Sequence, residues 1–128
     1  MDQKAYKLTW EDKSLAYDKD YNEYFSSYYN PVGRLLIPKS VGKLFCFSSI
    51  EFVYDYVSLS FPDTLHLKVL YGTAFNIELQ QVVCLHIGDY KKFWNGEPVL
   101  TFESPKGTMI CNSFKVEKIC QYINGEII

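Results

Sequence analysis

The residues of this chain best suited to metal binding or nucleophilic catalysis are four cysteines and two histidines. No two cysteines form a Cys-x-x-Cys pair, and neither histidine has a carboxylate or cysteine at ligand spacing. Each cysteine has apolar neighbours. We therefore expect no metal site and four reduced, buried thiols that act as small hydrophobes. A nucleophile pair stays open as an alternative that only co-occurrence supports, and its members would be Cys84 and His66.

Phosphate-binding loops are missing from the sequence. It contains neither Gly-x-Gly-x-x-Gly nor a complete Walker A motif, because no glycine precedes Lys106-Gly107-Thr108 at the needed spacing. Asp18-Lys19-Asp20 begins like an EF-hand loop but lacks the glycine and the closing glutamate. We therefore expect no cofactor.

A stripe of aromatic residues between positions 17 and 29 is the strongest periodic signal. Its members recur three and four residues apart with polar residues between them, which predicts one face of an α-helix that ends before Pro31. Tyrosine favours a surface with one dry and one wet side, whereas a purely buried face would more often use Leu, Ile or Val. The helix is predicted either to lie over a sheet with its hydroxyls at the rim or to form a contact surface. The stripe consists of Tyr17, Tyr21, Tyr24, Phe25, Tyr28 and Tyr29.

Five residues are candidates for binding a ligand or a partner. Arg34 follows a glycine and could grip a phosphate or carboxylate with its planar guanidinium. Tyrosine and tryptophan offer large, rigid contact areas that also stack on bases. The alternative is that these side chains only pack, with one surface charge among them. The candidates are Tyr21, Tyr24, Tyr28, Arg34 and Trp94.

An arginine, a Ser-x-Ser pair and a later glutamate occur in the order Arg34, Ser58–Ser60 and Glu78 or Glu103. This order resembles that of the mono-ADP-ribosyltransferases, which carry an Arg on an early strand, a Ser-x-Ser strand and a later catalytic Glu. The resemblance covers three scattered residue types. It implies an ADP-ribosyltransferase-like enzyme as the alternative to a binding protein.

In the first half of the chain, alternation over residues 6–10 predicts a half-buried strand. Residues 33–38 predict a brief strand or an extended segment at an edge. Residues 44–47 predict a buried strand, followed by a helix through about Val57 that is capped by Ser48 with Glu51. A further strand is predicted over residues 65–71. Strand, helix and strand together have the size of a β-α-β crossover, although the sequence leaves parallel pairing open.

The second half of the chain reads as mostly strand. Residues 82–87 predict a well-buried strand, and Asn95-Gly96 a type I′ hairpin. Another strand is expected at residues 108–111. Residues 113–123 fit a helix or a strand, and we favour the strand. The predicted fold is therefore α+β, a single globular domain over residues 1–128 with a mostly antiparallel sheet and two helices packed on it.

Composition narrows the class of protein. The chain is 48% hydrophobic and 22% charged, as expected of a folded globule, and its net charge of −2 shows no footprint for nucleic acid. The sequence shows neither a membrane-spanning apolar run nor an apolar signal segment, so we expect a cytoplasmic protein. Arginine occurs once against twelve lysines, a bias typical of AT-rich coding sources such as low-GC bacteria and their phages.

These observations predict a small non-catalytic binding protein, of the kind that a phage or mobile element encodes. It would engage a host protein or sequester a small anionic, nucleotide-like ligand through its aromatic-rich surface. Assembly into a homo-oligomer is compatible with the sequence. An enzyme would instead require a concave pocket with a convergent carboxylate.

Overall fold

The computed structural model describes residues 2–10, 13–14, 32–38, 42–60 and 67–128. The helices are α1 (Ile50–Ser60), α2 (Tyr90–Trp94) and a 3-10 helix η1 (Ile87–Asp89). The strands are β1 (Gln3–Trp10), β2 (Lys13–Ser14), β3 (Leu35–Leu36), β4 (Leu44–Phe47), β5 (Leu67–Phe75), β6 (Glu78–Leu79), β7 (Val82–Cys84), β8 (Thr101–Glu103), β9 (Thr108–Cys111), β10 (Ser113–Ile123) and β11 (Glu126–Ile127).

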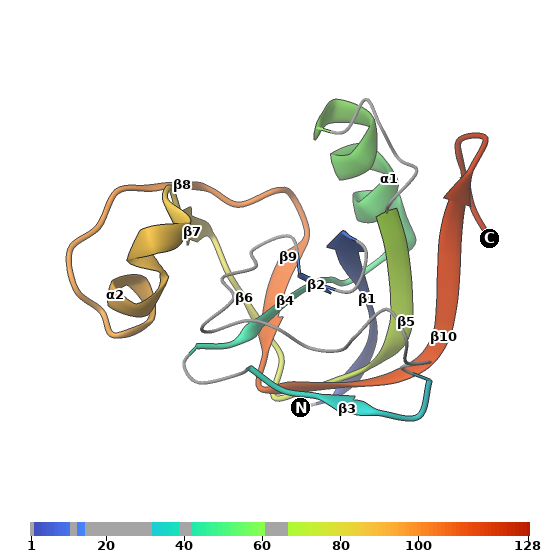
Figure 1. Cartoon of the computed structure of the whole chain (residues 1–128), viewed down its shortest axis with the longest axis horizontal. Coiled ribbons are helices and arrows are strands. Elements are labelled where there is room, and N and C mark those ends of the chain that lie inside the picture. The colour runs from blue at the N-terminus through green and yellow to red at the C-terminus, as the bar shows by residue number, and fades with distance from the viewer. Residues whose placement is uncertain (1, 11–12, 15–31, 39–41, 61–66) are drawn as a thin grey trace.

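The main sheet has the strand order β11-β10-β5-β1-β4-β9-β6, with β2 and β3 added beside β1 and β10 (Figure 1). All its described pairings are antiparallel. A separate two-stranded sheet is formed by β7 and β8. The expected sheet-rich fold with a largely antiparallel sheet is confirmed, as is the strand at residues 113–123.

The predicted strand, helix and strand around residues 44–71 are present as β4, α1 and β5. Both strands pair antiparallel with β1, which lies between them, so β4 and β5 run parallel to each other in a split β-α-β arrangement. The helix begins at Ile50, so Ser49 rather than Ser48 directly precedes its first residue.

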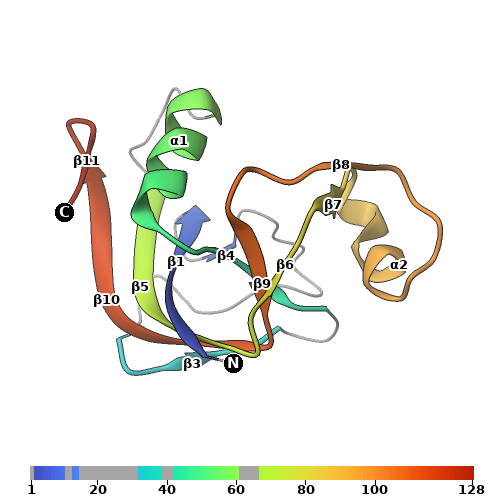
Figure 2. The same cartoon turned by 180° about the vertical axis from the view of Figure 1, so that it is seen from behind.

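A sharp bend in the two longest strands shapes the sheet. Figures 1 and 2 show β10 running along one end of the molecule and then turning beside β5. The register between β10 and β5 shifts between Val116 and Lys118, which marks a bulge in β10. Gly72 lies opposite Val116, and a Cβ atom there would overlap with the Lys115 carbonyl oxygen. Glycine at this position therefore permits the close approach of the two strands.

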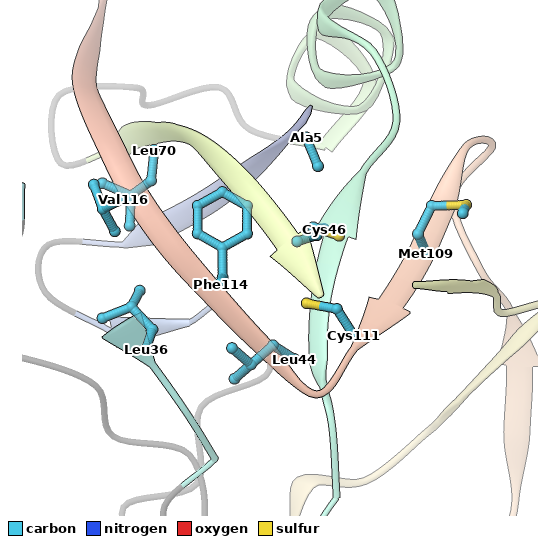
Figure 3. Close-up of a cluster of buried hydrophobic side chains, with 10 residues drawn as sticks. Ala5, Leu36, Leu44, Cys46, Leu70, Met109, Cys111, Phe114 and Val116 are labelled. Atoms are coloured by element: carbon cyan, nitrogen blue, oxygen red, sulfur yellow. The ribbon is translucent and has the colours of Figure 1, made fainter. Parts of the chain in front are cut away.

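Hydrophobic clusters cover both faces of the main sheet. One contains Phe114, which is fully buried and lies at the centre of the side chains shown in Figure 3. The other contains Val53 and Val57 of α1, which pack on the opposite face. The first cluster is Ala5, Leu36, Leu44, Cys46, Leu70, Ala74, Met109, Cys111, Phe114 and Val116. The second is Leu8, Phe47, Val53, Val57, Leu67, Val69 and Cys120.

The first strand differs from the half-buried strand that its alternation predicts. Lys7 and Thr9 occupy the positions expected to face water, but they are 1% and 0% exposed. They lie on the same face as Ala5, which belongs to the cluster around Phe114. Both faces of β1 are buried because it lies in the middle of the sheet with a cluster on each side.

The predicted hairpin at Asn95-Gly96 is wrong. These residues end α2, where Glu97 N–H donates to Lys92 O at 2.9 Å and Gly96 N–H to Phe93 O at 3.2 Å. This is a Schellman motif, with Gly96 in the left-handed conformation at φ 77°. The other Asn-Gly pair of the described residues, Asn124-Gly125, does form a two-residue hairpin, which joins β10 and β11.

The helices agree with the prediction only in part. The expected aromatic helix at residues 17–29 lies outside the described residues. A short helix that was not predicted, α2, lies within the segment expected to form the hairpin. The strand predicted at residues 82–87 is present only as β7, which ends at Cys84, and its predicted burial is wrong, since Val82 is 41% exposed. Helix α1 packs on the main sheet, whereas α2 lies mainly beside η1 and β7 and reaches the main sheet through the ring contact of Trp94 with Phe45.

Candidate functional site

The structure describes two of the five binding residues predicted from the sequence. Tyr21, Tyr24 and Tyr28 lie outside the described residues. Arg34 precedes β3, whereas Trp94 ends α2, and Figures 1 and 2 show β3 and α2 in different parts of the molecule. The described chain therefore does not bring these two candidates into one site.

Arg34 is held at the margin of the main sheet by backbone hydrogen bonds to β10. Gly33 N–H donates to Val116 O at 2.7 Å, and Val116 N–H donates to Arg34 O at 3.0 Å. Gly33 adopts φ 85°, which glycine tolerates, so this turn can form directly before β3. Arg34 is exposed, and its guanidinium suits a contact with an anion.

Trp94 of α2 packs against the main sheet. Its ring centroid lies 5.7 Å from that of Phe45 on β4 and 5.1 Å from that of Phe93. Gly42 lies against the indole, where a Cβ atom would overlap with the ring. This packing ties α2 to the main sheet, so the described contacts of Trp94 are structural.

We use the name β7–β8 lobe for residues 82–103, which comprise β7, η1, α2 and β8. Val83 is opposite Phe102, and Leu85 N–H donates to Leu100 O at 2.9 Å, so these two apolar pairs share one face of the ribbon. Leu85 is 49% exposed, Leu100 64% and Phe102 47%. Apolar side chains that are exposed together in this way are typical of a contact surface.

Among the described residues, no strand pairs with the outer edge of β8. Bonded and non-bonded pairs alternate along an antiparallel ribbon, and the pair of Leu85 and Leu100 is bonded. The backbone groups of Thr101 and Glu103 therefore point away from β7. Within the described chain β8 pairs with β7 alone, so this edge presents backbone donors and acceptors that another extended chain could use.

A buried lysine, Lys7, lies inside the main sheet near two cysteines, Cys46 and Cys111. Lys7 is fully buried, and its Nζ donates to Phe45 O at 2.7 Å. Burial lowers the pKa of Lys7 to about 8, although the neighbouring Cys111 and Cys46 favour its charged form. An ammonium group is costly to bury without partners, so the charged form of Lys7 depends on hydrogen-bond acceptors such as Phe45 O.

The four cysteines are free thiols, three of them buried and Cys84 half-buried. Among the residues that the structure describes, no group of three or more His, Cys, Asp or Glu side chains could hold a metal ion. None of the described helices is both long enough and apolar enough to cross a membrane.

The strand that the ADP-ribosyltransferase resemblance implies is not formed. Ser58 lies in the last turns of α1, where its Oγ donates to Asp55 O at 3.0 Å. Glu78 lies on β6 and contacts Lys43 Nζ at 2.6 Å, at the opposite end of the sheet order from β10 and its neighbour β3. Glu103 belongs to the separate sheet of β7 and β8. The resemblance in residue order therefore has no matching arrangement in the described residues.

Two features of these sites were missed by sequence reasoning. The strand returning from the predicted Asn95-Gly96 hairpin corresponds to β8, but the hairpin gave it the wrong partner, so its pairing with β7 and its exposed apolar face were missed. Lys7 gave no usable signal, because a lysine that alternates with apolar residues is typical of the solvated face of a strand. Comparison with protein-family models, curated proteins and solved structures found no match to this chain.

Proposed function

We propose that this chain is a small non-catalytic binding protein whose partner is another protein. The observation that carries the proposal is the apolar face of the β7–β8 lobe beside the open edge of β8. A protein partner suits these features better than a small anionic ligand, because Arg34 and Trp94 lie in different parts of the molecule. The tyrosines at positions 21, 24 and 28 stay candidates for a further contact.

The exposed side chains provide apolar area for such a contact. Leu100, which directly precedes β8, and Phe102 on β8 face the same side, which is the spacing that an extended partner segment would match. Burying such a side chain completely contributes about 1.5–3 kcal/mol relative to full exposure, and roughly half of that remains to be gained here because the side chains are half-exposed. Isolated two-stranded ribbons are only marginally stable, so a third strand would also stabilise the lobe itself.

The open edge selects an extended main chain as the occupant. A partner strand beside β8 would bond to the outward backbone groups of Thr101 and Glu103, which is the mode called β-augmentation. A basic residue opposite Glu103 would face a carboxylate, and an apolar residue opposite Phe102 would extend the apolar face. The proposed partner is therefore an extended peptide with alternating apolar and basic residues.

Selection of linear peptides from a displayed library on the full chain tests the proposal. Thr101→Pro removes an outward N–H without removing a bond to β7, and Phe102→Ser removes apolar area. We expect each change to weaken binding of the selected peptides at least about tenfold, the loss typical of an interface anchor. Isothermal titration calorimetry measures the affinity.

The matched control is Ile123→Ser, which polarises an apolar side chain of similar exposure, 44%, on β10. It should leave peptide affinity unchanged. Hydrogen exchange of the complex should protect the amides of Thr101 and Glu103. Peptides that bind Thr101→Pro and Phe102→Ser as tightly as the unmodified chain would refute this surface as the binding site.

A further inference from the structure

Helix α1 covers one end of a face of the main sheet, the end where β5 begins and β10 ends (Figures 1 and 2). There Leu8, Val69 and Cys120 belong to the hydrophobic cluster that contains residues of α1. Side chains two residues apart on a strand, or opposite each other on paired strands, share a face, so this face continues beyond the helix. We use the name tyrosine–lysine face for its continuation, which is exposed or half-buried throughout and consists of Lys4, Tyr6, Tyr71, Thr73, Lys115, Glu117 and Lys118.

Two aromatic rings lie at the centre of the tyrosine–lysine face. Tyr6 on β1 is opposite Tyr71 on β5, and their ring centroids are 5.1 Å apart with the ring planes tilted by 48°. Both side chains are half-buried, so part of each ring is accessible. Aromatic side chains on neighbouring strands of an open sheet form a platform on which unpaired bases stack, because every base has a π-face.

Two lysines border the ring pair on the β10 side. Lys118 lies opposite Tyr71, and Lys115 lies opposite Thr73 in the next row. Rows two residues apart are separated by about 7 Å, close to the spacing of consecutive phosphates in an extended single strand. Both lysines are exposed, and neither forms an ion pair in the part of the chain that the structure describes. Their ammonium groups are therefore available to an anionic ligand.

The carboxylates near this face do not cancel the charge of these two lysines. Glu117 is paired with Lys4. Burial raises the pKa of Tyr6, and the Glu51 carboxylate adds to the shift, so Glu51 lies on the β1 side of the rings, as does Asp2 directly before β1. The β10 side therefore keeps a positive excess. The net charge of −2 for the whole chain has little effect on it, because salt screens exposed charges beyond about 8–10 Å.

We propose that the tyrosine–lysine face binds single-stranded nucleic acid, with bases stacked on Tyr6 and Tyr71 and phosphates over Lys115 and Lys118. The ring pair favours this ligand over an acidic peptide, which would use the lysines but leave the rings without a stacking partner. RNA and DNA share both features that this face recognises, the charge of the phosphates and the π-face of the bases. The ligand is additional to the protein partner proposed for the β7–β8 lobe.

Fluorescence anisotropy of the full chain with labelled oligouridylate and oligothymidylate of about 12 nucleotides tests the proposal. We expect binding at about 50 mM salt that weakens as the salt concentration rises, and the tighter of the two oligonucleotides identifies RNA or DNA as the preferred ligand. The double change Lys115→Gln and Lys118→Gln should weaken binding. It should also reduce the slope of log affinity against log salt by about 1.4, because each phosphate contact in a single strand contributes about 0.7.

Tyr71→Leu tests the stacking separately from the charge. It keeps an apolar side chain and removes the aromatic ring, so affinity should fall at least about fivefold, the lower bound for one stacked base, while the salt slope stays the same. A Tyr71→Leu variant that binds both oligonucleotides as tightly as the unmodified chain would overturn the proposal. So would an oligoglutamate peptide that competes as well as the oligonucleotides, because the face would then attract anions alone.

The matched control is the double change Lys91→Gln and Lys92→Gln, which alters two exposed lysines of α2 outside this face. It should leave affinity and salt slope unchanged. Phe102→Ser should also leave oligonucleotide binding unchanged while it weakens peptide binding, so the two proposals can fail separately. No binding of either oligonucleotide at about 100 µM protein would refute the nucleic-acid proposal, as would an equal loss of affinity in the α2 control.

Discussion

Phe114 on β10 and Phe102 on β8 are both strand phenylalanines, yet the first is fully buried and the second is 47% exposed. The main sheet covers its strands with a cluster on each face, whereas the β7–β8 lobe has two strands and leaves one apolar face uncovered. Burial on both sides favours stability, while an uncovered ribbon is available for association. The comparison separates the residues that hold the fold from those that we propose bind a partner.

The largest expected effect is on the free energy of unfolding of a Phe114→Ala variant. Removing a fully buried phenylalanine should cost about 3–5 kcal/mol through lost burial and a residual cavity. Phe102→Ala should cost less than about 1 kcal/mol, because half of its side chain is already in water. Urea denaturation measures both. Equal losses would show that the lobe and the main sheet form one core, contrary to the comparison.

The next largest effect concerns pH and Lys7. Its folded pKa of about 8 lies below its usual value of 10.5, so the unfolded chain binds more protons between these pH values. Stability from this group should therefore rise with pH between about 8 and 10.5, by up to about 3 kcal/mol. Below pH 8 the full cost of burying the ammonium is present.

Lys7→Met removes this titration while keeping the volume of the side chain. As the pH rises from 8 to 10, the unfolding free energy of the unmodified protein should approach that of Lys7→Met. Other titrating groups are the same in both proteins, so their effects largely cancel in the difference. A difference that is constant with pH would mean that the folded pKa of Lys7 is not depressed.

A smaller effect should appear where the two regions meet. Gly42→Ala puts a methyl group into the Trp94 ring at a position with φ 91°, which costs about 1–2 kcal/mol for the backbone alone. The lobe should loosen, with faster hydrogen exchange in α2 and little change in β5. Gly88→Ala is the matched control, because its added methyl group meets nothing within 4 Å. Equal exchange in the two variants would show that Trp94 does not tie the lobe to the main sheet.

Local sequence signals predicted several elements well. The strand, helix and strand around residues 44–71 and the strand at residues 108–111 follow from runs and periodicities of neighbouring residues. The candidate site was harder to predict. Among the proposed binding residues that the structure describes, Arg34 and Trp94 have suitable chemistry, but which residues lie near each other depends on strand order, which spacing does not encode.

The two Asn-Gly pairs show where local information ends. The sequence alone determined that Gly96 and Gly125 would adopt left-handed conformations, at φ 77° and 81°, because the dipeptide favours them in either context. Tertiary structure decided that the first ends a helix and the second turns a hairpin, since the outcome depends on whether a partner strand lies alongside. The same holds for Lys7, whose strand was predictable but whose burial came from β4, β5 and the cluster around Phe114 closing over it.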